Sequence, residues 1–258
     1  MRIVFFGASE LGYHCCEKIL AMKQNVVGIF TMPKIFNISY SPDKPVNNIL
    51  HRDFYELGYK HGIPVVCVEK KMIEYRDTLS SMHPDFILVI GWYYMIPQSI
   101  RDIAPLGCAG IHSSLLPKYR GGAPLVWAII NGEKEAGVSF FYMDDGVDTG
   151  DIIGQGAFSI EETDTIREVL LKAENAALHL LEEFIPKMAE GTAPRVQQNH
   201  NEASIFHQRT PEDGLIDWTW EKEKIQNFIR AQTRPYPGAY TIIGDKKVTI
   251  WDAKIQAY

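Results

Sequence analysis

The chain has 258 residues, a net charge of −6 at pH 7 and a hydrophobic content of 46%. This length allows one large domain with a small appendage, and the hydrophobic content suffices for a sizeable core. The acidic balance gives no overall attraction to nucleic acid, and no apolar run approaches the ~18 residues of a membrane-spanning helix. The four cysteines include no C-x-x-C pair, so we expect free thiols and a cytoplasmic protein without a membrane partner.

The first ninety residues alternate short apolar runs with helical patterns. Residues 2–6 and 26–30 predict strands on either side of a helix at 10–22, which is the βαβ unit of a parallel sheet. The first turn does not match the G-x-G-x-x-G fingerprint, which argues against a dinucleotide site. A proline-containing loop is expected at 31–45. Further helices are predicted at 47–61 and 70–82, and further strands at 63–68 and 85–90.

The same alternation continues to a polar linker. Strands are predicted at 107–112, 137–143 and 151–159, with helices at 124–131 and, capped by Thr163, at 163–190. Residues 1–190 therefore predict an α/β domain with a Rossmann-like, mostly parallel sheet. Residues 191–203 are interpreted as the linker. Residues 204–258 predict a small C-terminal α+β domain, with a helix at 221–231 and short strands near 205, 216, 240 and 248–255.

Two titratable side chains lie where predicted strands end. His112 closes the strand at 107–112, and Asp148 lies in a loop rich in glycine and aspartate after the strand at 137–143. Ligands of open α/β sheets bind beyond the carboxyl ends of the strands, so we expect both side chains in one cleft. A histidine beside a carboxylate can move protons near neutral pH, which makes both residues catalytic candidates. No metal is expected.

The residues around this pair form motifs that resemble the folate-dependent formyltransferase family. These motifs are Ser114-Leu115-Leu116-Pro117, Arg120-Gly121, Pro124, Trp127 and Asp148-Thr149-Gly150. The segments 209–213 and 234–239 are similar to the second domain of the methionyl-tRNA and sugar-nucleotide members, so the resemblance covers nearly all of the chain. It implies that 10-formyltetrahydrofolate is the cosubstrate, that His112 and Asp148 are catalytic, and that the C-terminal domain is a reduced OB-like barrel.

The resemblance also implies where folate and acceptor bind. Two loops would hold the folate, through Ile90, Gly91, Trp92, Tyr93, Met95, Asp145, Val147 and Asp148. The acceptor would contact Ser9, Glu10, Ser114 and Lys118, although Ser9 or Glu10 could equally cap the helix that follows. At one position the chain departs from the family. Gly110 stands where the usual Asn-x-His triplet has the asparagine that helps to bind the formyl oxygen.

The resemblance favours formyl transfer to a primary amine, and most closely to the amino group of a nucleotide-linked amino sugar. Hydrolysis of 10-formyltetrahydrofolate is the alternative, because the resembling hydrolase domain also lacks the asparagine. Formylation of methionyl-tRNA is disfavoured, because residues 31–45 carry only Lys34 and Lys44 as cations and phosphate binding needs several. A homodimer is left open.

Overall fold

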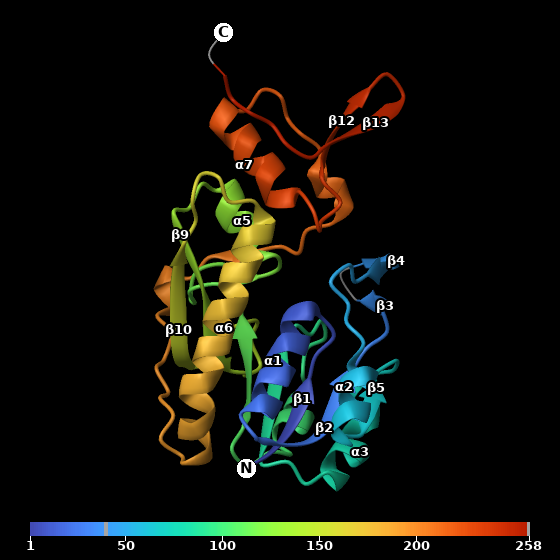
Figure 1. The fold of residues 1–258 in the computed structure, drawn as a ribbon, viewed down its shortest axis with the longest axis vertical. Helices are drawn as coiled ribbons and strands as arrows, with labels where there is room; N and C mark the ends of the chain where they lie inside the picture. The colour runs from blue at the N-terminus through green and yellow to red at the C-terminus, as the bar shows by residue number, and fades with distance from the viewer. Residues whose placement is uncertain (39–40, 257–258) are drawn as a thin grey trace. The chain divides into compact units, whose positions relative to one another are not determined.

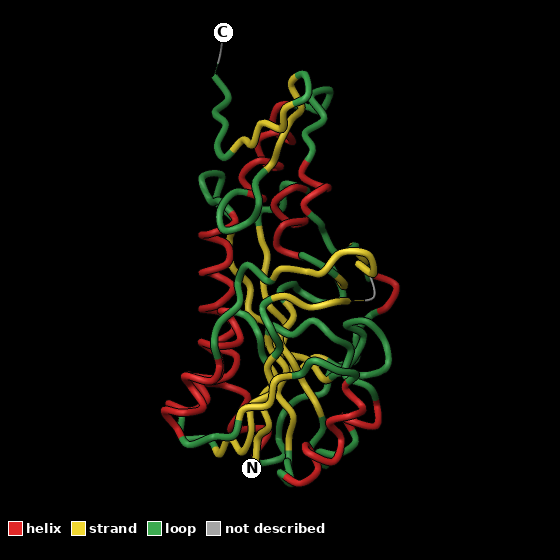
Figure 2. Tube along the Cα trace, turned by 90° about the vertical axis from the view of Figure 1, so that its right-hand side faces the viewer, coloured by secondary structure: helices red, strands yellow, loops and turns green. Residues whose placement is uncertain are grey.

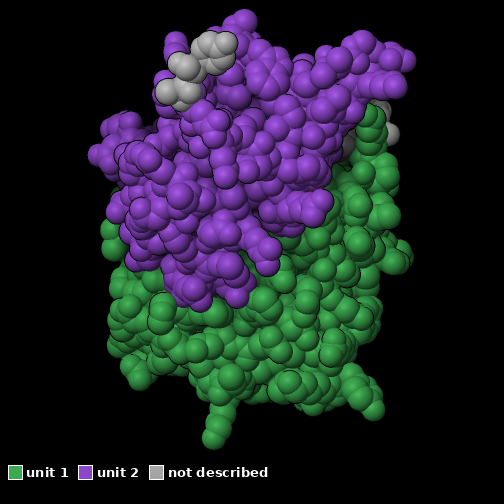
Figure 3. All heavy atoms as spheres, turned by 45° about the horizontal axis from the view of Figure 1, so that its top comes forward, with its two compact units in different colours: residues 1–112, 139–154, 177–198 green, residues 113–138, 155–176, 199–258 purple. Residues whose placement is uncertain are grey.

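The computed structural model describes residues 1–38 and 41–256. These residues form two compact units, which Figure 3 distinguishes by colour. Unit 1 comprises residues 1–112, 139–154 and 177–198, and unit 2 holds the remaining described residues. The predicted domains 1–190 and 204–258 divide the chain differently, and they stay a prediction. Residues 39–40 of the predicted loop and 257–258 of the predicted C-terminal domain lie outside the described residues.

The largest sheet of the described residues has seven strands in the order β10-β9-β7-β6-β1-β2-β5, and all of them except parts of β9 and β10 belong to unit 1. The neighbours from β5 to β7 pair in parallel, and β9 pairs antiparallel with β7. This arrangement confirms the predicted α/β fold with a mostly parallel sheet. The strands are β1 (Arg2–Phe6), β2 (Asn25–Thr31), β5 (Val65–Cys67), β6 (Phe86–Ile90), β7 (Cys108–His112), β9 (Glu135–Tyr142) and β10 (Ile152–Ser159).

Helices cover both faces of the central strands (Figure 1). On one face, Phe5 stacks on Phe54 and Tyr13 meets the same ring edge-on. Successive side chains of a strand point to opposite faces, and Phe6 accordingly packs in a second cluster with Leu79 and Ile100. The first face carries α1 (Glu10–Ala21) and α2 (Phe54–His61); the second carries η1 (Met72–Tyr75), α3 (Arg76–Ser81) and α4 (Gln98–Arg101).

The prediction of an irregular loop at 31–45 is wrong. The segment forms a two-stranded antiparallel sheet of β3 (Ile35–Ile38) and β4 (Ser41–Asn47), seen as strands in Figure 2. Phe36 and Ile38 alternate along β3 and are buried in one cluster with Trp92 and Tyr93. The hairpin therefore owes its order to side chains that lie more than fifty residues further along the chain, which the local pattern does not reveal.

Other predicted bounds change for local reasons. The helix predicted at 47–61 begins only at Phe54, because Asp53 caps it by accepting a hydrogen bond from the Tyr55 N–H at 2.8 Å. Helix α6 (Ile166–Ala189) is capped by Thr165 rather than Thr163, since the Thr165 hydroxyl accepts from the Arg167 N–H at 3.2 Å. The predicted helix at 70–82 splits into η1 and α3, and the strand expected at 248–255 ends at Ile250.

Unit 2 contains the small C-terminal α+β part that the sequence predicts. Helix α7 (Lys222–Gln232) packs against α5 (Pro124–Ile130), and β12 (Ala239–Ile243) pairs antiparallel with β13 (Lys246–Ile250). Strand β8 (Arg120–Gly121) pairs in parallel with β11 (Ile205–Phe206). Two short helices, η2 (His200–Glu202) and η3 (Pro211–Gly214), complete the C-terminal segment. Among the described residues of this segment, β12 and β13 form one two-stranded sheet, and β11 belongs to another with β8.

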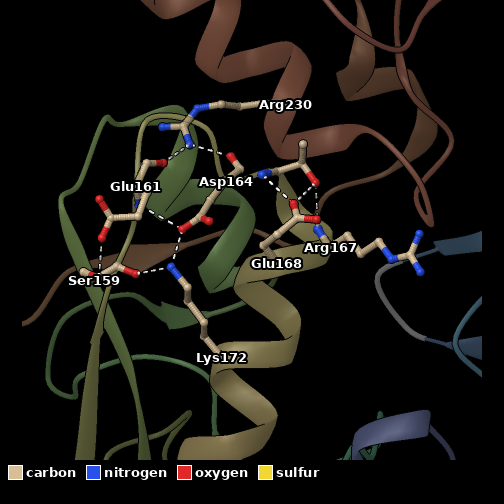
Figure 4. A network of polar contacts seen from close by, with 8 residues as sticks. Ser159, Glu161, Asp164, Arg167, Glu168, Lys172 and Arg230 are labelled. Carbon is tan, nitrogen blue, oxygen red and sulfur yellow. Dashed lines mark hydrogen bonds and ion pairs between the residues drawn. The ribbon is translucent and has the colours of Figure 1, made fainter.

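A polar network joins α7 to the turn before α6 (Figure 4). Lys172 contacts the Asp164 carboxylate at 2.5 Å, and Arg230 donates to the carbonyl oxygens of Glu161 and Asp164 at 3.1 and 2.7 Å. Burial by itself raises the pKa of Asp164, but hydrogen bonds from Lys172 and from the Glu161 N–H outweigh it, and the pKa lies below its ordinary value. Arg230 thus fixes α7 to the backbone of this turn, while the ionised Asp164 carboxylate holds the turn to Lys172 of α6.

Candidate active site

The order of the strands reverses between β1 and β6, which creates a switch point at their carboxyl ends. From β1 the chain passes outward to β2 and β5, and it then returns to β6 and β7 on the other side. The loops that follow β1 and β6 meet there, since the Ala8 N–H donates to the carbonyl of Gly91 at 3.1 Å. Open α/β sheets bind ligands at such a point.

His112 and Asp148 lie together at this edge of the sheet. His112 is the last residue of β7, and Asp148 lies in the loop between β9 and β10. The His112 Nδ1 is 3.5 Å from the Asp148 Oδ2, and the two side chains are 11% and 20% exposed. This separation is longer than a hydrogen bond, as is common for catalytic pairs without substrate. The pair can share and transfer a proton.

The loop that carries Asp148 is held in a tight shape by its own residues. Asp144 accepts hydrogen bonds through its Oδ1 from the Gly146 N–H at 3.0 Å and from the Thr149 hydroxyl at 2.6 Å. A side chain at Gly150 would place its Cβ 1.9 Å from the carbonyl oxygen of Tyr142. The Asp-Asp-Gly-x-Asp-Thr-Gly pattern therefore encodes a specific loop conformation.

A cavity of about 170 Å³ lies beside Asp148 in unit 1. Four of the predicted folate residues line it, namely Trp92, Tyr93, Met95 and Asp148, whereas Ile90, Gly91, Asp145 and Val147 do not. Ile90 is fully buried, and Val147 is exposed. The sequence reading missed the other lining residues, although several of them alternate with predicted ones along the chain: Val89, Tyr94, Ile96, Phe141, Met143, Asp144 and Gly146.

The loop after β6 is fastened to its surroundings on two sides. The Tyr93 hydroxyl donates to the Asn48 Oδ1 at 3.0 Å, while the Asn48 side chain donates to the Ala8 carbonyl at 2.9 Å. Buried Arg101 donates to the carbonyl of Ile96 at 2.7 Å and also contacts the Asp145 carboxylate. Asp145 therefore ties one wall of the cavity to the other through Arg101, a role that the sequence did not reveal.

The predicted acceptor residues are found in two places. In unit 1, the Ser9 side chain accepts from the Gly12 N–H at 3.3 Å and caps α1, and Glu10 is exposed in the first turn of that helix. In unit 2, Ser114 and Lys118 line a cavity of about 120 Å³ with Tyr119 and Glu133, among others. The buried Ser114 hydroxyl donates to the carbonyl of Lys118 at 2.7 Å.

Tyr119 of this second cavity has a raised pKa. Its hydroxyl donates to the Glu133 Oε1 at 2.6 Å and accepts from the Asn131 side chain at 3.1 Å. Burial and the hydrogen bond to Glu133 raise the pKa of Tyr119 to about 12. The tyrosine therefore stays neutral at physiological pH and serves as a hydrogen-bond donor.

The described residues contain neither a cluster of metal-ligating side chains nor a membrane-spanning helix. Within residues 1–38 and 41–256, His, Cys, Asp and Glu side chains form no group of three or more that could hold a metal ion. In the same ranges, no helix has both the length and the apolar character needed to span a membrane. Within the described residues, Cys15, Cys16, Cys67 and Cys108 take part in no disulfide.

Comparison with known proteins now decides the family. Residues 1–185 match the family described as "Formyl transferase", and residues 209–257 match "Formyl transferase, C-terminal domain". The chain belongs to the formyltransferase family. A curated relative, the methionyl-tRNA formyltransferase of Clostridioides difficile (strain 630), is 36% identical over 259 residues, which cover 99% of this chain and 81% of the relative.

Solved formyltransferase structures share the fold. A sugar N-formyltransferase from Shewanella sp FDAARGOS_354 superposes with a TM-score of 0.76 at 17% identity and covers 100% of this chain and 99% of its own. An N-formyltransferase from Helicobacter canadensis, in complex with folinic acid and dTDP-3-aminofucose, has a TM-score of 0.72 at 20% identity, covering 95% of this chain and 85% of its own. This chain is a folate-dependent formyltransferase, and 10-formyltetrahydrofolate is its formyl donor.

Gly110, which the resemblance predicts to stand at the asparagine of an Asn-x-His triplet, lies on β7 two residues before His112. Gly110 pairs with Val89 across β7 and β6. A Cβ atom at Gly110 would lie 2.4 Å from the Val89 carbonyl oxygen and 2.7 Å from the Met143 Cε. Real Cβ atoms do not approach a backbone oxygen so closely, so no asparagine fits here without movement of the strand. Gly110 therefore has a backbone role, the close approach of two strands.

Proposed function

We propose that this formyltransferase formylates the amino group of a nucleotide-linked amino sugar, with His112 and Asp148 as its catalytic residues. The observation that carries the proposal is the position of Asp148, which both lines the cavity of unit 1 and faces His112 at 3.5 Å. The formyl carbon of a folate held in that cavity would then lie beside a group that takes up a proton. Amine formylation needs such a group.

The reaction forms one bond and breaks another. The amine nitrogen attacks the formyl carbon, the new C–N bond forms, and the carbonyl electrons move to the oxygen. Asp148 takes a proton from the attacking nitrogen, because a nitrogen that stayed protonated would leave more readily than N10 when the tetrahedral intermediate collapses. His112 donates a hydrogen bond to the oxyanion, a contribution worth roughly 3–4 kcal/mol in comparable sites. When the oxyanion collapses, the carbonyl re-forms, the bond to N10 of the folate breaks, and N10 receives the proton that Asp148 took from the amine.

The walls of the cavity suit the ring system of the folate. Trp92, Tyr93, Tyr94 and Ile96 supply apolar and aromatic surface. A volume of about 170 Å³ is below the ~300–1,000 Å³ of pockets that enclose whole drug-sized ligands. We therefore place the pterin ring in the cavity and the glutamate tail outside it. Folinic acid bound in the Helicobacter canadensis relative supports this assignment of ligand class.

The nature of β3 and β4 supports a small acceptor over tRNA. Lys34 precedes this hairpin and Lys44 lies within it. The apolar side chains of the hairpin pack against Trp92 and Tyr93. A tRNA contact requires several cations, because affinity comes from neutralised phosphates. The dTDP-3-aminofucose in complex with the Helicobacter canadensis enzyme supports an amino-sugar nucleotide, whereas the relatedness to the Clostridioides difficile enzyme makes charged tRNA the competing acceptor.

The decisive experiment is a formyl-transfer assay with three arms. A panel of nucleotide-linked amino sugars, charged initiator methionyl-tRNA and a reaction without acceptor are each incubated with 10-formyltetrahydrofolate. We expect turnover with at least one amino-sugar nucleotide and a formylated amine by mass spectrometry. If the enzyme formylates the tRNA efficiently and formylates none of the amino-sugar nucleotides, the acceptor assignment is overturned. Equal folate release with and without acceptor would instead establish the hydrolase, in which water replaces the amine at the same His112 and Asp148.

A further inference from the structure

We infer that Gln198 is a positioning residue for catalysis, which acts by holding the backbone of the Asp148 loop. The inference rests on the proposed function, because it gives Gln198 a role only if Asp148 takes part in the reaction. Gln198 lies in the segment that the sequence predicts to be a linker, yet its side chain is 4% exposed. A glutamine buried to this degree needs hydrogen-bond partners.

The partners of Gln198 are two carbonyl oxygens of the catalytic loop. Its Nε2 donates to the carbonyl of Asp148 at 2.9 Å and to the carbonyl of Gly150 at 2.7 Å. A primary amide has two N–H donors, and both are used on residues two apart in the same loop. The side chain therefore fixes the direction of the chain between Asp148 and Gly150.

Asp148 needs this support because its backbone conformation is unfavourable. Its φ is +54°, in the left-handed region that costs most residues free energy and that persists only where the surroundings hold it. The conformation directs the Asp148 carboxylate toward His112 while its carbonyl points to Gln198. Without the two donors, the carbonyls of Asp148 and Gly150 each lose a hydrogen bond, and the loop loses one of the contacts that hold this conformation.

Neighbours of Gln198 fasten the same part of the loop. The Arg195 Nε contacts the Asp151 Oδ2 at 3.3 Å, and its guanidinium lies 3.8 Å from the Tyr142 ring centroid. Val196 and Ile152 exchange two backbone hydrogen bonds of 2.8 and 2.9 Å. Residues 195–198 therefore form a strap along the carboxyl-terminal side of the loop, and Gln198 is the part of the strap that reaches Asp148.

Kinetics of Gln198→Met beside Gln197→Met test the inference. Methionine keeps the size of the side chain and removes both donors, and Gln197 is an adjacent, exposed glutamine that serves as the matched control. We expect Gln198→Met to lower kcat about 10- to 100-fold, as when a catalytic group is misplaced by about 1 Å. The KM for 10-formyltetrahydrofolate should stay near the wild-type value, and Gln197→Met should match the wild type in both constants.

A double-mutant cycle separates positioning from general destabilisation. In an Asp148→Asn background, Gln198→Met should lower single-turnover rates no further, because its effect passes through the carboxylate. Additive losses in the cycle, or a wild-type kcat for Gln198→Met, would overturn the inference. If thermal melts show that Gln198→Met does not fold, Gln198→Asn replaces it. The shorter amide reaches one carbonyl at most, so a wild-type kcat there would also overturn the inference.

The same set of variants keeps the two proposals apart. If Asp148→Asn itself turns over like the wild type, the assignment of the catalytic pair fails. If Asp148→Asn is nearly inactive while Gln198→Met is fully active and folded, the catalytic pair stands and the positioning role of Gln198 fails.

Discussion

Asp148 and Asp164 are both poorly exposed aspartates in loops that flank β10, yet the protein holds them in opposite ways. Asp164 is fixed by its carboxylate, which contacts Lys172 and the Glu161 N–H (Figure 4). Asp148 is fixed by its main-chain carbonyl, which accepts from Gln198, while its carboxylate faces His112 at 3.5 Å. An anchored carboxylate stabilises a fold. A carboxylate whose backbone is anchored instead can take part in proton transfer.

The largest expected effect follows from substituting His112 and Asp148, the pair that we propose to be catalytic. His112→Ala and Asp148→Asn should each lower kcat by about 10²–10⁴-fold, the usual contribution of a positioned acid or base. Both variants should still bind the folate, which a binding titration measures. The matched control is Asp164→Asn, which should keep the wild-type kcat. A comparable loss of kcat in a folded Asp164→Asn enzyme would erase the distinction between the two aspartates.

A smaller effect, on stability, is expected from a substitution in β7, the strand that carries His112. In Gly110→Ala, the added Cβ would lie 2.4 Å from the Val89 carbonyl, so β6 and β7 must separate or the variant must remain strained. We expect a loss of about 1–3 kcal/mol in unfolding free energy, or roughly 2–12 °C in melting temperature for a chain of this size. Gly191→Ala is the control, because no atom lies within 4 Å of its Cβ position, although its positive φ adds a small cost of its own. A melting temperature no lower than that of the control would show that the strands adapt freely.

The smallest effect concerns pH and the anchored aspartate. Because the pKa of Asp164 is lowered in the folded state, its carboxylate stabilises the fold above its unfolded pKa of about 3.9. This stabilisation is lost as the pH falls through the folded pKa. The melting temperature of the wild type should therefore decrease as the pH is lowered below about 4. Asp164→Asn should have a lower melting temperature than the wild type at pH 7, but its melting temperature should change less as acid is added. Glu162→Gln is the control, because the Glu162 side chain is 89% exposed; its melting temperature should follow that of the wild type at every pH. If the melting temperature of Asp164→Asn changes with pH in parallel with the wild type, this account is contradicted.

The sequence revealed those parts of the site that local patterns encode. Apolar runs ending in turn residues located the strand ends, and so His112 at the carboxyl edge of the parallel strands. Strand β9 pairs antiparallel with β7, so its carboxyl end does not share that edge, and Asp148 comes within 3.5 Å of His112 through the loop that follows β9. The hairpin of β3 and β4 was missed because its order depends on Trp92 and Tyr93, which are distant in the sequence. Gln198 was taken for part of a linker because its partners are carbonyl oxygens, and every residue type carries one. Contacts between a side chain and a remote backbone leave no trace in composition or spacing.

The close approach at Gly110 also bears on how the site can change over generations. Its neighbour across the sheet is a backbone oxygen of Val89, with the Met143 side chain on another side. A smaller residue at 143 would relieve one of these contacts, but no substitution at 89 removes a carbonyl. A lineage that exchanges Gly110 for asparagine must therefore first change the spacing of β6 and β7 through other residues. The order in which such mutations can be accepted is therefore constrained by a backbone atom rather than by a side chain.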